Sequence, residues 1–218
     1  MLDLHFLAAA DGSPMTKGFS LDKAGNIIKH PYPMVKHFNS YTETVGDIEE
    51  FHNAIVTHAA QGHCLLKGQL DRPLINEPRA GHTSPNTTTR WMVLDNDYLH
   101  DISPDELMAL LGLEGNYIAQ YSSSAGILPD KMGYHIFYML DKDAHPDQLK
   151  AILKNWNMAI PSISEHITLA ASGVTLKWPL DISVCQNDKL IYIAPPICGE
   201  GIKDPLSNRI NLIRKDAP

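Results

Sequence analysis

Apolar and polar residues follow a regular pattern from position 90 onward, and this pattern predicts both strands and helices. Short apolar runs predict strands at 91–94, 116–121, 134–140, 181–184 and 190–193. A capping box at 103–106, with proline at the first helical position, predicts a helix to about residue 111. Pro146 opens an amphipathic helix. The last two strands are predicted to form a hairpin around 186–188.

The first part of the chain is predicted to be an N-terminal extension, residues 1–62. Clusters of turn formers make residues 1–46 irregular in this interpretation. Asp47 is expected to cap a helix that ends near residue 60. Residues 63–200 then form the main domain, and 201–218 a tail or linker.

The order of these elements, strand–helix–strand–strand–helix–strand, predicts an α+β fold with an RRM-like (ferredoxin-like) core, on which an N-terminal α/β extension packs. The sheet order in this topology is 4-1-3-2, and strands 3 and 4 run antiparallel to strand 1. The ends of strands 1 and 2 therefore meet the starts of strands 3 and 4 at one edge of the sheet.

Two aspartates, Asp95 and Asp97, follow the first of these strands. Residues two apart on a strand point to the same side, so both carboxylates leave the strand on one face. Such close like charges repel each other, and a divalent cation with a preference for hard oxygen ligands, Mg²⁺ or Mn²⁺, relieves the repulsion. A solvated Asp-Asn-Asp turn is the alternative explanation.

Other polar residues are expected at the same edge, namely Ser122 to Ser124, His135 and Asp181. Three aspartates with a histidine and hydroxyl groups fit two-metal phosphoryl transfer, in which cations activate the nucleophile and neutralise the triphosphate. His135 would donate a hydrogen bond to a phosphate oxygen. A packed strand histidine and an ordinary turn aspartate remain alternatives for His135 and Asp181.

Composition narrows the class of protein. The chain has 218 residues, 44% hydrophobic and 20% charged, which is typical of a globular protein of one domain. A net charge of −7 argues against a basic nucleic-acid coat protein. No apolar run approaches the roughly 18 residues of a membrane span, and the N-terminus lacks the basic region of a signal peptide. We therefore expect a cytoplasmic protein that does not contact a membrane.

Three short motifs resemble those of the archaeo-eukaryotic primase superfamily, in particular the primase-polymerase domains of phages and plasmids. They are the DxD pair at 93–97, the histidine motif at 133–138 and the hydrophobic-Asp motif at 180–184. The resemblance covers residues 63–197. The chain departs from the family pattern at Gly133, where the family has a serine; its serines lie about a dozen residues upstream of His135.

The resemblance implies a DNA primase-polymerase that uses Mg²⁺ or Mn²⁺. Asp95, Asp97 and Asp181 would be the catalytic metal ligands. The predicted nucleotide-binding residues are His135, Ser122, Ser124, Lys67 and Arg72. The implied partners are a single-stranded DNA template, NTP or dNTP, and a replicative helicase module on the same or another chain, in the host cytoplasm if a phage encodes the protein.

Basic residues precede the first aspartate motif and are candidates to bind triphosphate or template, namely Lys67, Arg72, Arg79 and Arg90. Two other functions also fit the pattern. A sugar-nucleotide glycosyltransferase also places DxD after an apolar strand. A non-catalytic RRM-like nucleic-acid-binding or replication-initiator module would use exposed strand aromatics such as Trp91, Tyr134 and Tyr138.

Overall fold

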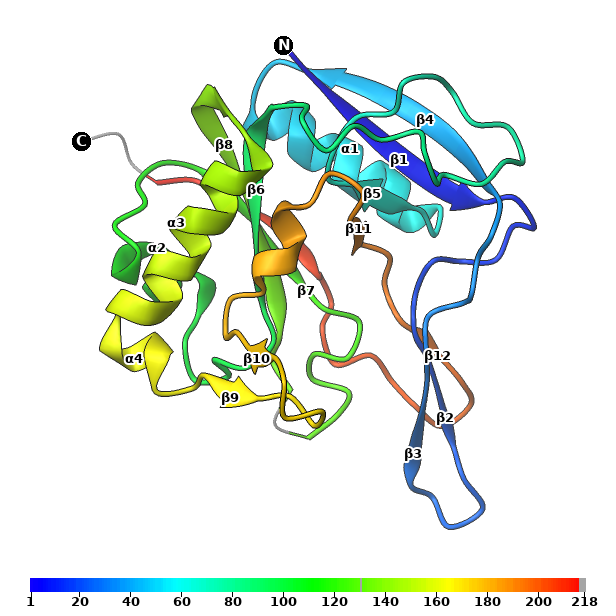
Figure 1. Ribbon diagram of the computed structural model, residues 1–218. Coiled ribbons are helices and arrows are strands. Elements are labelled where there is room, and N and C mark those ends of the chain that lie inside the picture. Colours follow the sequence, from blue (N-terminus) through cyan, green and yellow to red (C-terminus); the bar gives the residue numbers. More distant parts are fainter. Residues whose placement is uncertain (130, 216–218) are drawn as a thin grey trace.

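The computed structural model describes residues 1–129 and 131–215, and it shows an α+β fold built on two four-stranded sheets (Figure 1). The core sheet has the order β13-β7-β8-β6, with each neighbouring pair antiparallel. Its strands are β6 (Thr89–Asn96), β7 (Tyr117–Tyr121), β8 (Tyr134–Ala144) and β13 (Ile210–Ile213). The predicted fold class is thus confirmed, as are the first three strands of the predicted core.

The predicted fourth strand at 181–184 is wrong. Leu180 makes a single bridge to Asn96 of β6, and a 3₁₀ helix, η1 (Ile182–Cys185), follows. The side chain of Asp181 accepts a hydrogen bond from the backbone N–H of Ser183, which turns the chain away from the sheet. The fourth position of the RRM-like sheet is therefore reduced to one bridge beside β6.

Helices cover both faces of the core sheet (Figure 1). On one face lie α2 (Pro104–Leu110), α3 (Pro146–Ala159) and the short α4 (Pro161–Ser164). On the other lies α1 (Ile48–Ala60), capped by Asp47 as predicted. Phe51 of α1 packs edge-on against Trp91 and Phe137, with ring centroids 5.5 and 5.9 Å apart. Since both aromatics are buried here, this sheet face is part of the core.

Two N-terminal strands and two strands from later in the chain form a second sheet, the N-terminal sheet, of order β11-β5-β1-β4. Its strands are β1 (Leu2–Ala9), β4 (Phe38–Val45), β5 (Cys64–Leu66) and β11 (Leu190–Tyr192). The prediction that residues 1–46 are irregular is wrong, because β1 gains its hydrogen bonds from the distant β4 and β5. The predicted hairpin around 186–188 is also wrong, because β11 pairs with β5.

A hairpin of β2 (Gly18–Leu21) and β3 (Ile27–His30) extends from the body of the molecule, and β12 (Ile197–Cys198) pairs with β2 (Figure 1). A smaller hairpin joins β9 (Thr168–Leu169) to β10 (Leu176–Lys177). The predicted tail 201–218 includes β13, an edge strand of the core sheet, while residues 216–218 lie outside the described residues. None of the helices in the described part of the chain is both long and apolar enough to cross a membrane.

Candidate active site

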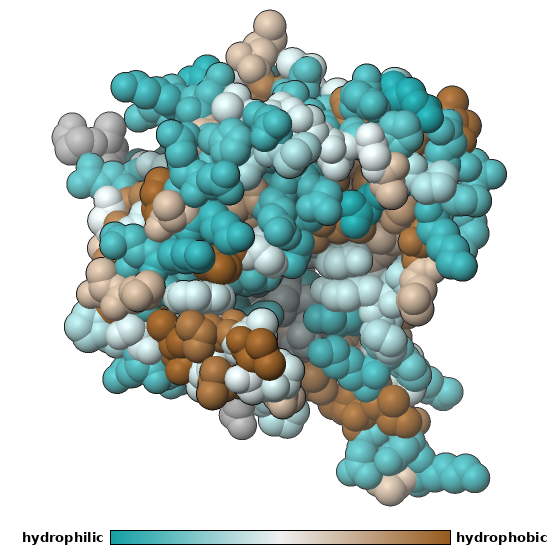
Figure 2. Space-filling model, in the orientation of Figure 1, coloured by the Kyte–Doolittle hydropathy of each residue, from teal (hydrophilic) through white to brown (hydrophobic). Residues whose placement is uncertain are grey.

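A pocket of about 220 Å³ lies where the edge of the core sheet faces residues from the N-terminal and β11 segments. Figure 2 shows the surface hollowed between these two parts of the molecule. Five of the predicted site residues line the pocket: Asp95, Asp97, Ser122, His135 and Asp181. Residues separated by almost 90 positions in the sequence therefore share one site. Sequence reasoning missed three other lining residues, namely Lys17, Tyr32 and Lys189. Tyr192, which the sequence favoured as a packed strand aromatic over a base-stacking one, also lines the pocket.

Asp95 and His135 form an ion pair at the centre of the pocket. They face each other across β6 and β8, with 3.4 Å between His135 Nε2 and Asp95 Oδ1. Burial opposes charge on both groups, but their mutual attraction raises the pKa of His135 and, with Lys189 and Lys17, lowers that of Asp95. The pair therefore favours a charged carboxylate beside a protonated imidazole.

Gln120 holds His135 in place. It lies opposite His135 on β7, and its Oε1 is 2.5 Å from His135 Nδ1. Since the amide oxygen can only accept, Nδ1 carries hydrogen and Nε2 faces Asp95. Sequence reasoning missed Gln120, although one polar residue within an otherwise apolar strand, Tyr117–Tyr121, was a possible signal.

Asp97 lies at the exposed side of the pocket without an ion-pair partner among the described residues. Its partly buried position, together with the negative charges of Asp95 and Asp181, raises the pKa of its carboxyl group. His135 compensates the charge of Asp95. The repulsion between the two DxD carboxylates therefore raises the pKa of Asp97 and not that of Asp95. The Asp97 carboxylate is the uncompensated negative charge to which a cation would be drawn.

We expect Asp97→Asn to raise the melting temperature of the metal-free protein at neutral pH. A raised carboxyl pKa means that the charged form is disfavoured in the folded state, so its removal stabilises the fold above that pKa and has no such effect at acidic pH. Thermal unfolding of wild type and variant in chelator, at neutral and acidic pH, measures this. Asp95→Asn should show the opposite sign, because it breaks the pair with His135.

Asp181 is positioned by hydrogen bonds that α3 and β6 make to the backbone of residues 180 and 181. Asn157 of α3 bonds the backbone of Leu180 twice, at 2.9 and 3.0 Å, and the N–H of Asp181 donates to the carbonyl of Asp95 at 3.0 Å. The Asp181 carboxylate accepts hydrogen bonds from the hydroxyl and N–H of Ser183, and Lys189 Nζ lies 3.4 Å away. Asp181 therefore lines the pocket with its oxygens already bonded.

The side chain of Ser122 lies next to Gly133, the position where the family pattern has a serine. A β-carbon placed on Gly133 would lie 3.4 Å from Ser122 Oγ, and the Ser122 N–H donates to the Gly133 carbonyl. Buried Arg209 holds this loop by donating to the carbonyls of Ser122 and Ala125. Ser124, also predicted to bind nucleotide, does not line the pocket.

Lys67 and Arg72 do not line the pocket either. Lys67 is only 1% exposed, donates to Thr89 Oγ1 at 2.7 Å and lies 4.3 Å from the centroid of the Trp91 ring. The prediction that Lys67 contacts nucleotide is therefore wrong, because its four-carbon stem packs into the core. Arg72 instead pairs with Glu77 on the surface.

The buried Lys67 should make stability depend on pH. Burial lowers its pKa from 10.5 to about 7, so between these values the unfolded chain holds a proton that the folded chain has lost. The free energy of unfolding should therefore rise as pH increases above about 7, and Lys67→Met should flatten this rise. Urea unfolding of both proteins across this range measures the difference. An equal slope in Lys67→Met and in the exposed control Lys154→Met would contradict it.

The side chains at the pocket fit a cation held by two carboxylates. Among residues 1–129 and 131–215, no three His, Cys, Asp or Glu side chains are already gathered around a point where a metal could bind. Mg²⁺, however, is usually bound by one or two carboxylates together with water and substrate phosphates. The uncompensated Asp97 beside Asp95 matches this arrangement, and the bonded Asp181 matches it less well.

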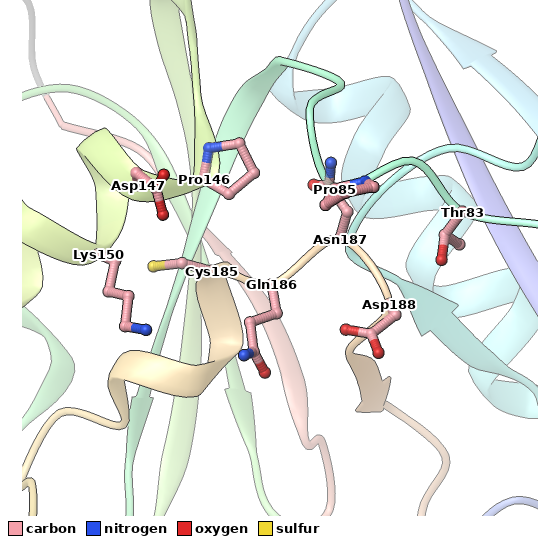
Figure 3. A pocket seen from close by; sticks show the side chains of 9 residues that line it. All are labelled: Thr83, Pro85, Pro146, Asp147, Lys150, Cys185, Gln186, Asn187 and Asp188. Carbon is pink, nitrogen blue, oxygen red and sulfur yellow. The ribbon is translucent and has the colours of Figure 1, made fainter. Parts of the chain in front are cut away.

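A larger pocket of about 310 Å³ lies at the start of α3, beside the segment after Asp181 (Figure 3). Pro146, Asp147 and Lys150 of α3 face Cys185 and Gln186 across it. None of the predicted site residues lines this pocket, so its size alone does not make it the reactive centre.

Comparison with known proteins gives little further information. No family model matches the chain, and no curated protein matches it. Among solved structures, it is similar to the polymerase domain from Mycobacterium tuberculosis Ligase D in complex with DNA, with a TM-score of 0.37 and 12% sequence identity. The alignment covers 82% of this chain and 57% of that structure. A likeness at this level establishes neither family nor activity.

Proposed function

We propose that the protein is a template-dependent nucleotidyltransferase, a DNA primase-polymerase of the type its motifs resemble, which uses Mg²⁺ or Mn²⁺. One observation carries this proposal: a carboxylate pair suited to a cation shares a small pocket with His135 and two lysines suited to an anion. A nucleoside triphosphate bound with a divalent cation presents both charges together.

Asp95 and Asp97 are the residues that would hold the cation, which when bound would neutralise charge on the transferred phosphoryl group. Asp95 lies in β6 and Asp97 directly follows its last residue, so the two residues are two positions apart and their carboxylates point to the same side of the strand. Asp181, the third predicted ligand, would have to exchange its bond to Lys189 for the cation, and that lysine would then be free to pair with phosphate.

The cationic side of the pocket would bind the triphosphate. Protonated His135 is held by Gln120 through Nδ1, and its Nε2–H, which faces Asp95, would have to exchange that carboxylate for a phosphate oxygen. Lys17 and Lys189 supply charge nearby. Ser122 Oγ lies in the space that a side chain at position 133 would reach, so we infer that it serves in place of the serine that the family pattern has there.

The alternative of a non-catalytic RRM-like binder is less well supported, because two of the three strand aromatics that it requires are buried. Trp91 and Tyr134 are each 2% exposed, and only Tyr138 is half-buried, with its hydroxyl donating to the Glu114 carbonyl. Bases stack on exposed rings in that class of module. A glycosyltransferase remains the second candidate enzyme, since it also uses a DxD pair, but it gives His135 no role.

The test is incorporation of labelled NTP or dNTP into a primed and an unprimed single-stranded DNA template, with Mg²⁺, with Mn²⁺ and with chelator. We expect metal-dependent transfer to the strand. Turnover of a UDP-sugar without nucleotide transfer would favour the glycosyltransferase, and strand binding with neither activity would favour the binding module. A helicase partner stays a prediction.

A further inference from the structure

A groove of about 360 Å³ adjoins the candidate active site and shares Tyr32, Leu190 and Tyr192 with it. We call it the Lys36–Arg79 groove, after its two cations. The two tyrosines form the common wall between groove and pocket. Whatever occupies the groove would therefore lie next to the reacting nucleotide.

The charge of the groove contrasts with that of the whole chain. The net charge is −7, yet two cations and no carboxylate line the groove. Lys36 is exposed and forms no ion pair within the described residues. Arg79 donates one hydrogen bond, from Nη1 to the Asp188 carbonyl at 2.6 Å, which leaves most of its five N–H donors for a ligand. An anionic ligand is thus favoured here.

Aromatic and apolar side chains lie beside these cations. Tyr32 and Tyr192 are stacked, with ring centroids 3.7 Å apart and planes 13° from parallel. Lys17 Nζ also lies 4.6 Å from the centroid of Tyr32, and the half-buried Tyr192 lines both the groove and the pocket. Met34, which lines the groove, is 96% exposed, and its flexible side chain can adapt to a flat ligand.

We propose that the Lys36–Arg79 groove binds a single strand of nucleic acid, with backbone phosphates on Lys36 and Arg79 and a base against Tyr192 and Met34. Non-specific single-strand sites combine these two features, a positively charged path and aromatic rings on which bases stack. The inference rests on the proposed function for the identity of the strand as template or primer. Binding itself can be measured without catalysis.

The first test compares two double variants of equal net charge. Lys36→Ala with Arg79→Ala removes the groove cations, and Lys154→Ala with Lys177→Ala removes two exposed cations elsewhere. Fluorescence anisotropy of labelled oligothymidylate, titrated over a range of salt, gives the affinity. Loss of two phosphate contacts should reduce the slope of log affinity against log salt by about 1.4. The control pair should leave the slope near that of the wild type.

The second test concerns the aromatic ring. Tyr192→Leu should weaken binding of the oligonucleotide by about five- to a hundred-fold, because one stacked base is lost. Tyr192→Phe keeps the ring and should bind like the wild type. Circular dichroism on both variants confirms folding, and if Tyr192→Leu fails to fold, Met34→Ser, at an exposed position, takes its place in the comparison.

Equal weakening in both charge-matched pairs, or competition by polyglutamate as strong as by oligonucleotide, would overturn the groove assignment. If the wild type transfers nucleotides and the groove variants are unimpaired at limiting strand, the groove is rejected while the proposed activity stands. If the groove variants lose strand binding but the wild type transfers no nucleotide, the groove stands and the activity is rejected.

Discussion

Asp95→Asn is expected to reduce metal-dependent nucleotide incorporation by at least about a thousand-fold. The change removes one of the two carboxylates that would hold the cation and also the partner that keeps His135 protonated. Stabilisation of developing charge by a bound cation contributes several kcal/mol, and each 1.36 kcal/mol corresponds to about ten-fold in rate. Initial rates at saturating strand and nucleotide measure the effect.

The matched control is Asp141→Asn, an exposed carboxylate without an ion pair among the described residues. It removes the same charge from the surface and should keep near wild-type activity. Circular dichroism should show that Asp95→Asn remains folded. A folded Asp95→Asn protein with wild-type incorporation would rule out the metal role of Asp95.

His135→Ala is expected to lower kcat/KM for the nucleotide by about ten- to a hundred-fold. The imidazole would donate to a charged phosphate oxygen, and such a hydrogen bond contributes about 1.5–3 kcal/mol. Affinity for single-stranded DNA should stay nearly constant, since the cations of the Lys36–Arg79 groove, and not His135, would bind the backbone phosphates of the strand. Kinetics with varied nucleotide and anisotropy with labelled DNA separate the two quantities.

If His135 were only a packing residue, the variant would instead melt at a lower temperature while the folded fraction bound nucleotide normally. The exposed His166→Ala is the control for loss of a histidine elsewhere. Gln120→Leu, which removes the acceptor for His135 Nδ1, should give a smaller loss of the same kind as His135→Ala. Unchanged kinetics in both pocket variants would reject the phosphate contact.

The core of the fold could be predicted from sequence because its signals are local. The capping box at Ser103, the Pro146 helix start and the apolar runs of β6, β7 and β8 each lie within one element. The N-terminal sheet could not be predicted in this way. β1 pairs with β4 and β5, and β5 with β11, so the sheet depends on contacts between residues far apart in the chain.

The same distinction holds at the candidate site. Asp95, Asp97 and His135 lie in short motifs at strand ends, and the antiparallel register of β6 and β8 brings them together. Lys17 and Tyr32 reach the pocket only because the N-terminal segment packs there, and Asn157 holds Leu180 from a helix distant in sequence. Lysine side chains are almost always exposed, so the sequence favoured a solvent-facing Lys67 that could bind a phosphate, and it held no signal for burial in the core.

The central claim is that Asp95 and Asp97 hold a divalent cation together with a nucleoside triphosphate. Electron paramagnetic resonance of Mn²⁺, titrated with protein in the presence of a non-hydrolysable nucleoside triphosphate, tests it without requiring turnover. Wild type is expected to bind the Mn²⁺–nucleotide complex, and the folded double variant Asp95→Asn/Asp97→Asn to lose that binding. Equal binding by both proteins would contradict the account.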